Sequence, residues 1–329
     1  MKQICLKIVR CVILVLLPLM FLAACAADPK AVSPPLQTDQ VQQNVAAVDR
    51  QPPETVQVNE AIGNDGNGDS GDDGWRICVA RPDGEEIWSF TETEIAGFPP
   101  EQAEAFVHAY SSINNWPTAG FLAADGYSIE SLLKIAGVFD TAQTITFRAE
   151  DGYEISLTRE QLLSEQFYFP LVGESFDGAE PVIPIIAYRM REGTSDLSEL
   201  REEKPTLVFG QRNPFEHTNP AFVERVTEII VDDSPCGSWG LASTFPAQGQ
   251  IAEGETVKLQ HESYGFVKLF YTLDGSDPTP LSKMYNPSTY QPELNVPIPI
   301  TEPVTIKVLA TGFGKNDSDI AEFEFYPIS

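Results

Sequence analysis

The spacing of apolar and polar residues divides the chain into four stretches of different character. An apolar run over residues 11–21 follows a basic start, and residues 26–74 then hold few large apolar side chains. From residue 75 onward, short apolar runs alternate with turn-forming Pro, Asp and Gly, a pattern typical of strands joined by tight turns. The pattern therefore predicts that the folded part of the chain begins near residue 75.

Residues 75–233 predict a mixed α/β (α+β) domain. Strands are expected over residues 76–80, 86–90, 144–149, 153–157, 182–188, 206–209 and 223–231, and short helices over residues 100–110 and 158–163. The strongest helix signal covers residues 128–136. Ser128 can cap its first turn, apolar residues share one face, and Gly137 can end it.

Residues 241–329 predict an all-β domain. Strands are expected over residues 256–260, 267–272, 304–310 and 320–325, with no convincing helix between them. About 90 residues of this kind suit a small β-sandwich. Residues 234–240, which are rich in Ser, Pro and Gly, are predicted to link the two domains.

The first 24 residues read as a secretory signal peptide. Three basic residues precede the apolar run and small residues follow it. The run is shorter than the roughly 20 residues that a membrane-spanning helix needs, and Pro18 interrupts it, so an uncleaved membrane helix is the weaker alternative. Leu22-Ala23-Ala24-Cys25 resembles the lipobox of bacterial lipoproteins. The resemblance implies a diacylglycerol on Cys25 and an extracytoplasmic chain, lipid-anchored to the bacterial cell membrane.

Charge limits the partners of the mature chain. The whole chain has a formal net charge of −27, and its first 24 residues carry three cations and no acid, so the remainder carries −30. Such a chain is repelled by nucleic acid and by anionic lipid headgroups, which excludes a nucleic-acid partner. Residues 25–74 are predicted to be a disordered acidic tether, because they cannot bury enough apolar surface to fold.

The end of this tether has the spacing of a calcium loop. Asp65, Asn67 and Asp69 occupy the first, third and fifth positions of such a loop. However, Ser70 stands at the sixth position in place of Gly, and Arg76 at the twelfth in place of a bidentate Glu. We therefore interpret the segment as a linker.

Two cysteines remain after the signal and the lipidated residue are set aside. Cys78 and Cys236 lie near the two ends of the first predicted domain. In an oxidising compartment they could form a disulfide that ties its termini together. The alternative is two separate thiols, one on a strand and one in the linker.

Three segments of residues 75–233 match a known family in order. They read YSSINNWPTAGFLAADGYSIESLLKIAGV at residues 110–138, DGYEISLT at residues 151–158 and LVFGQRNPFEHTNPAFVERVTEIIV at residues 207–231. Together they resemble the molybdopterin-binding domain of the sulfite oxidase fold, in a branch found in extracellular proteins of Gram-positive bacteria.

Enzymes of that family hold molybdenum through the pterin dithiolene and one cysteine thiolate. The resemblance places this cysteine in a loop over residues 109–116. That loop contains no Cys, and Cys78 lies on the first predicted strand. Serine hydroxyls and asparagine amides are poor replacements for a soft thiolate. The departure therefore argues against molybdenum redox catalysis, and it leaves open a molybdopterin pocket that lacks the metal ligand.

Seven side chains are candidates for binding such a cofactor. Phosphate anchoring needs cations and backbone donors, and ring recognition needs hydrogen-bonding groups. The candidates by type are Asn114, Asn115, Trp116, Arg148, Gln211, Arg212 and His217. Arg148 also fits a surface ion pair with Glu150 or Glu154. Gln211, Arg212 and His217, together with Asn114 and Trp116, could instead hold two loops together. We favour that structural role for this cluster.

Two segments of the last domain also match a known family. They read FYTLDGSDPTPLSKMYNP at residues 270–287 and TIKVLATGFGKNDSD at residues 305–319. They resemble the immunoglobulin-like module appended to chitobiases, β-hexosaminidases and some fucosidases. The resemblance implies a β-sandwich that accompanies a catalytic domain without being the catalyst. Asp274 and Asp277 are accordingly interpreted as turn residues and not as a catalytic pair.

These observations predict a cell-surface lipoprotein without catalytic activity. It would display an oxidoreductase-like domain and a β-sandwich that binds a ligand, a glycan or another envelope protein. The alternative is a molybdopterin-dependent oxidoreductase with an atypical metal ligand. A glycoside hydrolase is disfavoured, because the chain has no room for a barrel of about 250 residues that would hold a hexosaminidase site.

Overall fold

The computed structural model describes residues 74–328. The predicted signal peptide, lipidated Cys25, tether and calcium-like spacing at residues 65–69 lie outside the described residues. The described residues all belong to one compact unit. None of the helices in the described part of the chain is both long enough and apolar enough to cross a membrane.

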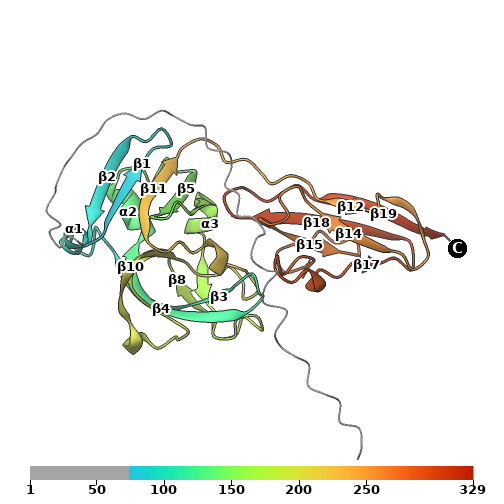
Figure 1. Cartoon of the computed structure of the whole chain (residues 1–329), viewed down its shortest axis with the longest axis horizontal. Helices are drawn as coiled ribbons and strands as arrows, with labels where there is room; N and C mark the ends of the chain where they lie inside the picture. The colour runs from blue at the N-terminus through green and yellow to red at the C-terminus, as the bar shows by residue number, and fades with distance from the viewer. Residues whose placement is uncertain (1–73, 329) are drawn as a thin grey trace, which may run out of the picture. The chain divides into compact units, whose positions relative to one another are not determined.

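We define the middle region as residues 74–233. One of its sheets is a five-stranded mixed sheet (Figure 1). Its strands are β1 (Arg76–Ala80), β2 (Glu86–Thr91), β5 (Thr144–Ala149), β6 (Glu154–Thr158) and β11 (Val226–Asp232), in the order β2-β1-β11-β5-β6. β11 pairs in parallel with β1, whereas the other pairs are antiparallel. The last strand of the region thus lies at the centre of the sheet and brings the two ends of the region together.

The second sheet of the middle region is antiparallel. Its order is β10 (Arg201–Val208), β9 (Ile185–Glu192), β4 (Ala119–Ser128) and β3 (Ala105–Ile113), and a separate pair joins β7 (Gln166–Tyr168) to β8 (Glu180–Val182). Gly126 lies where β4 crosses β9 most closely. A Cβ there would fall 2.2 Å from the carbonyl oxygen of Ile186, so only glycine fits.

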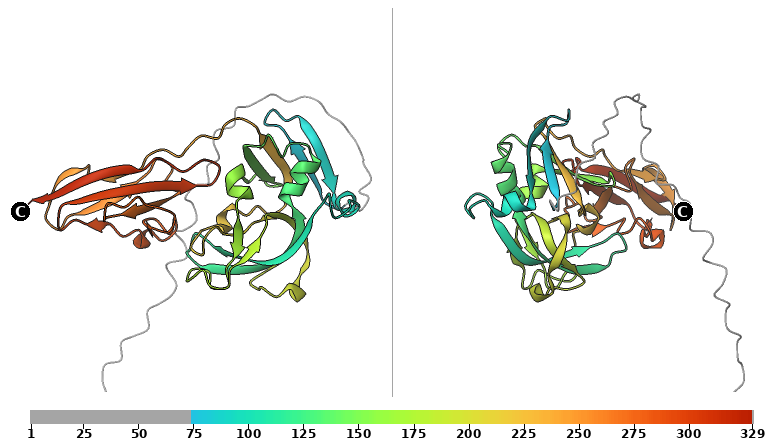
Figure 2. Two further views of the ribbon diagram at one scale, coloured as in Figure 1. Left: turned by 180° about the vertical axis from the view of Figure 1, so that it is seen from behind. Right: turned by 60° about the vertical axis from the view of Figure 1, so that its left-hand side comes forward.

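Three short α-helices accompany these sheets: α1 (Glu92–Ala96), α2 (Ile129–Ile135) and α3 (Arg159–Leu163). Ser128 caps α2 as predicted, and α2 lies beside the five-stranded sheet (Figure 2). Leu132 and Leu133 are fully buried in the core that this helix shares with the sheet. Thr158 and Gln161 form a capping box at the start of α3, which confirms that helix too.

Some of the predicted elements are wrong. Residues 100–110 are not a helix, because β3 begins at Ala105 and pairs with β4 at nine successive positions. The nearby helix is α1, whose Thr91–Glu94 capping box the sequence analysis missed. The predicted loop at residues 109–116 is mostly part of β3. The predicted strand at residues 182–188 divides into β8 and β9 at Pro184, which cannot donate to a sheet ladder. The described residues are therefore mostly β-sheet.

Residues 239–328, here called the C-terminal sandwich, contain two facing sheets (Figure 1). One sheet has the order β12 (Ser243–Phe245), β14 (Thr256–Gln260) and β17 (Ile298–Pro299). The other has the order β13 (Gly249–Ala252), β19 (Ala321–Ile328), β18 (Val304–Gly312), β15 (Val267–Thr272) and β16 (Lys283–Met284). Side chains such as Val257, Leu269 and Ile306 alternate inward from both sheets and form one core. The four strands predicted in this region are all present.

The turn after β18 joins the sandwich to the middle region. Phe313 packs edge-on against Phe209, with ring centroids 5.8 Å apart. The buried side chain of Gln161 donates to the carbonyl oxygens of Gly312 at 2.7 Å and Lys315 at 2.9 Å, and accepts from the Gly314 amide at 2.9 Å. Gly314 has φ +83°, and a Cβ there would lie 3.0 Å from the Ser156 carbonyl oxygen. The turn therefore depends on glycine at this position.

The predicted linker is also part of this junction. The Asn316 amide donates to the Gly237 carbonyl, and the Trp239 amide donates to the Asn316 carbonyl, both at 2.9 Å. The possible disulfide is not formed, because Cys78 and Cys236 are both free thiols. Cys78 lies on β1, where burial raises its pKa, whereas the Cys236 thiol donates to Asn316 Oδ1 at 3.5 Å.

Truncation of Phe313 tests this junction. We expect Phe313→Ala to lower the free energy of unfolding of residues 26–329 by about 2 kcal/mol or more, because it removes an aromatic side chain from a packed site. Leu281→Ala, at a side chain that is 59% exposed, should change it by less than about 0.5 kcal/mol. Urea denaturation of both variants measures the difference, and equal effects would contradict the packing role of Phe313.

Candidate functional site

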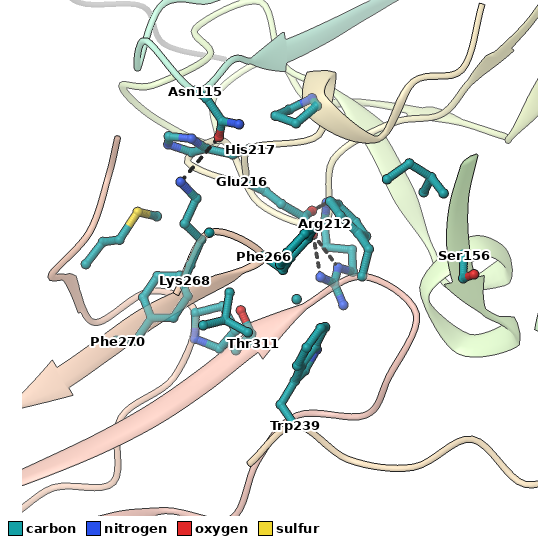
Figure 3. A pocket seen from close by; sticks show the side chains of 18 of the residues that line it. Asn115, Ser156, Arg212, Glu216, His217, Trp239, Phe266, Lys268, Phe270 and Thr311 are labelled. Atoms are coloured by element: carbon teal, nitrogen blue, oxygen red, sulfur yellow. Dashed lines mark hydrogen bonds and ion pairs between the residues drawn. The ribbon is translucent and has the colours of Figure 1, made fainter. Parts of the chain in front are cut away.

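A cavity of about 280 Å³ lies where the middle region meets the C-terminal sandwich (Figure 3). The middle region contributes the start of β6 and the segment that follows β10, and the sandwich contributes β15, β18 and the chain around Trp239. Its walls include Asn115, Tyr153, Glu154, Ser156, Arg212, Glu216, His217, Trp239, Phe266, Lys268, Phe270, Thr311, Gly312 and Phe313. The cavity thus exists only while the two regions stay packed together.

Lys268 is the unpaired cation of this cavity. Its Nζ donates to three neutral oxygens: the Pro287 carbonyl at 3.1 Å, the Asn286 carbonyl at 3.3 Å and Asn115 Oδ1 at 3.5 Å. None of the ion pairs found among residues 74–328 includes it. Burial lowers the pKa of Lys268 to about 8, because the charged form is partly desolvated.

His217 lies beside Lys268 and is neutral. Burial lowers the pKa of His217 to about 3, the nearby charge of Lys268 lowers it further, and the backbone of Asn114 opposes the shift. Its Nδ1 atom is buried and has no hydrogen-bond partner. A buried ring nitrogen without a partner is costly, and a ligand hydroxyl that enters the cavity would satisfy it.

The two carboxylates of the cavity are both engaged by arginines. Glu216 accepts from Arg212 Nε at 2.8 Å and from the Arg212 backbone amide at 2.6 Å. Glu154 accepts from Arg148 Nε at 2.9 Å. The acids are thus neutralised locally, and the charge of Lys268 stays uncompensated.

Aromatic rings form the apolar part of the walls. Phe266 is 78% exposed at the rim, whereas Phe270 is buried. The Nε1 atom of Trp239 is buried without a partner. Gly312 permits this arrangement, since a Cβ there would lie 2.9 Å from Trp239 Nε1 and 2.6 Å from the Phe266 carbonyl oxygen. This wall therefore offers an aromatic face, and the Trp239 Nε1–H group behind it makes no hydrogen bond within the described residues.

The structure brings three of the seven predicted cofactor residues to the cavity wall, namely Asn115, Arg212 and His217. Gln211 is buried behind them, where it accepts from Ser111 Oγ at 2.5 Å and donates to the Glu216 carbonyl at 2.8 Å. Asn114 Oδ1 accepts from the backbone amides of Trp116 at 2.8 Å and Thr118 at 3.1 Å. Gln211 thus links its segment to β3, whereas Asn114 orders the turn in which it lies.

The remaining predicted residues do not reach the cavity. The Trp116 ring stacks on Tyr290 of the sandwich, with centroids 5.3 Å apart. Arg148 pairs with Glu154 and Glu228 across neighbouring strands, not with Glu150. The acids of the β15 turn are structural as expected. Asp274 accepts from the Ser276 amide, and Asp277 pairs with Lys307.

Sequence reasoning missed the residues that the sandwich contributes. Lys268, Trp239 and Phe266 come from a part of the chain to which no site was assigned. Lys268 lies between the buried Val267 and Leu269 on β15, so alternation alone directs it away from the sandwich core. The same alternation is found for every surface lysine on a strand. Lys268 is distinguished from them only by the packing of the middle region against the sandwich.

The residues at the predicted cofactor site do not fit a molybdenum centre. Residues 105–113 form β3 and carry no thiol, and neither Cys78 nor Cys236 lines the cavity. Across residues 74–328, His, Cys, Asp and Glu side chains form no group of three with metal-binding geometry. The ligands within reach are amides, an imidazole and arginine-bound carboxylates, and none of them replaces a soft thiolate.

Comparison with known proteins identifies one part of the chain. Residues 246–322 match the family model described as chitobiase/beta-hexosaminidase C-terminal domain. The match covers most of the C-terminal sandwich and supports the resemblance carried by its turn sequences. No curated protein matches the chain.

The state of His217 can be tested by titration. With a pKa of about 3, the imidazole should stay neutral from pH 8 down to pH 5, so its Cε1–H chemical shift should stay constant over that range. Proton NMR measures this shift, and the spectrum of His217→Gln assigns the signal. A titration midpoint near pH 6.5 would contradict the buried, desolvated environment.

Proposed function

We propose that this protein is a surface-anchored binding protein without catalytic activity, and that its ligand is a sugar bound in the cavity between the two regions. The observation that carries the proposal is the wall composition. Aromatic rings lie beside buried polar atoms, His217 Nδ1 and Trp239 Nε1, that have no protein partner. Such a cavity is pre-formed for a ligand that has both apolar and hydroxyl surfaces.

A sugar combines these surfaces in one small molecule. The C–H face of a pyranose packs on an aromatic ring, and its hydroxyls both donate and accept hydrogen bonds. His217 Nδ1 and Trp239 Nε1 would each gain a partner of this kind. The family matched by residues 246–322 is named for chitobiases and β-hexosaminidases, and this name also favours a carbohydrate ligand.

The state of the acids supports a binding role over hydrolysis. Glycosidases use two carboxyl groups, one as an acid and one as a base or nucleophile. The two carboxylates that line this cavity, Glu154 and Glu216, each accept from an arginine instead. Both carboxylates are thus committed to ion pairs within the protein, and neither is free to face a bound sugar.

The proposal includes display outside the cell. The lipobox at residues 22–25 supports a lipid anchor on Cys25 in the bacterial membrane, and the acidic composition of residues 25–74 supports a tether. We infer that the middle region keeps a sulfite-oxidase-like fold without its redox chemistry. The missing thiolate and the ordered match of three segments are the grounds for that inference.

Removal of the aromatic walls tests sugar binding. We expect Trp239→Ala and Phe266→Ala each to weaken binding of a sugar by about tenfold, since each removes about 1–2 kcal/mol of stacking contact. A glycan array with residues 26–329 selects the sugar, and isothermal titration calorimetry measures its affinity. Leu281→Ala serves as the control for an exposed apolar side chain. Flat array signals for the unmodified protein would contradict the proposal.

The lipid anchor requires a separate experiment. In a bacterial host, the full chain should incorporate radiolabelled palmitate and sediment with membranes, whereas Cys25→Ala should do neither. Cys78→Ala should keep both properties and controls for the loss of a thiol. Membrane association of Cys25→Ala without the label would instead favour an uncleaved membrane helix.

A further inference from the structure

We propose that the sugar bound in the cavity carries a carboxylate, and that Lys268 binds this carboxylate. The inference rests on the function proposed above and narrows it to acidic saccharides, such as uronic acids. Three observations support it: Lys268 has no ion-pair partner among the described residues, two of its hydrogen bonds are long, and unpartnered polar atoms lie near it.

The charge balance of the cavity leaves one positive charge without a partner. Arg212 pairs with Glu216, and Glu154 pairs with Arg148, which is shared with a second acid, Glu228. His217 is neutral at physiological pH. The chain carries 48 acidic residues against 21 basic ones, yet none of the acids among the described residues pairs with Lys268. A cation that is partly withdrawn from water is usually paired, and an anionic ligand would supply the partner of Lys268.

The contacts of the ammonium group leave room for such a partner. Of its three hydrogen bonds, only the one to the Pro287 carbonyl, at 3.1 Å, lies within the usual range. The bonds to Asn286 and Asn115, at 3.3 and 3.5 Å, are long. A carboxylate oxygen at about 2.8 Å would form a stronger bond than either of these neutral acceptors.

The neighbouring polar atoms suit the rest of an acidic sugar. The side chain of Lys268 extends toward Asn115 and His217, while Trp239 lies on another wall of the cavity (Figure 3). A carboxylate at Lys268 would leave the ring hydroxyls near His217 Nδ1 and the ring face near the aromatic walls. One ligand would then satisfy the cation and the unpartnered imidazole nitrogen together.

Protonation of Lys268 links this binding to pH. The charged groups that face Lys268 are few: His217 lies beside it, and the Arg212–Glu216 pair and Glu154 lie along the walls. Glu154 pairs with Arg148 behind the wall. Burial lowers the pKa of Lys268 to about 8 in the free protein, and a bound carboxylate would raise it. Binding therefore takes up protons near pH 8, and affinity falls as the pH rises above that value.

Matched sugar pairs separate the effect of the carboxylate from the effect of the ring. Calorimetry with residues 26–329 compares glucuronate with glucose, and N-acetylmuramate with N-acetylglucosamine, at pH 7. We expect the acidic member of at least one pair to bind about tenfold or more tightly, as a charge-assisted hydrogen bond to a buried cation predicts. We expect Lys268→Met, which keeps the length of the side chain, to abolish that preference.

Lys258→Met is the matched control, because Lys258 is exposed on β14, in the other sheet of the sandwich. It should leave the preference unchanged, and thermal unfolding checks that both variants fold. Equal affinity for both members of each pair, or a preference that Lys268→Met retains, would overturn the carboxylate assignment and leave sugar binding intact. Absence of binding to every sugar, acidic or neutral, would overturn sugar binding as well.

The pH dependence of the unmodified protein gives a second readout that needs no variant. Affinity for the acidic sugar should fall about tenfold between pH 7 and pH 9, as Lys268 loses its proton while the sugar carboxylate stays ionised. Affinity for the neutral partner should not change. An acidic sugar that binds equally well at both pH values would overturn the role of Lys268.

Discussion

The contact between the Gly312-Phe313-Gly314 turn and the middle region is the interaction on which the cavity depends. Phe313 packs on Phe209, and the side chain of Gln161 closes three hydrogen bonds with the turn backbone. The two glycines let the chain pass where any larger residue would collide with Trp239, Phe266 or Ser156. These contacts turn two β-rich regions with separate cores into one compact unit with a cavity at the seam.

The electrostatics of the cavity between the two regions depend on which of its charged side chains form ion pairs. Arginine and glutamate side chains of the middle region pair with each other, so this region presents no unpaired cation to the cavity among the described residues. The sandwich contributes Lys268, which meets only neutral oxygens. In a chain with a net charge of −27, a partly buried lysine without an acid is a departure from what composition alone would produce. Binding of an anion is the simplest physical use for it.

Local signals in the sequence were sufficient for much of the fold. The Ser128 cap and the apolar face after it identified α2, and alternation identified the four sandwich strands, which are held by inward side chains such as Leu269 and Ile306. The helix predicted over residues 100–110 was wrong because pairing with β4 overrides weak local propensity. Pro184 broke a strand that its apolar neighbours had suggested was continuous.

Only part of the candidate site could be predicted from the sequence. Asn115, Arg212 and His217 were identified by residue type, yet they were assigned to a cofactor whose thiolate ligand is missing. Lys268 and Trp239 could not be found, because their role arises from packing between segments about 50 residues or more apart, which no local pattern encodes. A lysine between two buried residues of a strand looks like any solvent-facing side chain until the second region covers it.

A crystal structure of residues 68–329 grown with glucuronate tests the central claim most directly, since the described part of the chain, residues 74–328, forms one compact unit. We predict that the Phe313 turn is seated against Phe209, and that the sugar lies in the cavity with its carboxylate in hydrogen-bonding distance of Lys268 Nζ. Separation of the two regions, or a sugar bound elsewhere with Lys268 still contacting only Asn115, Asn286 and Pro287, would contradict the account.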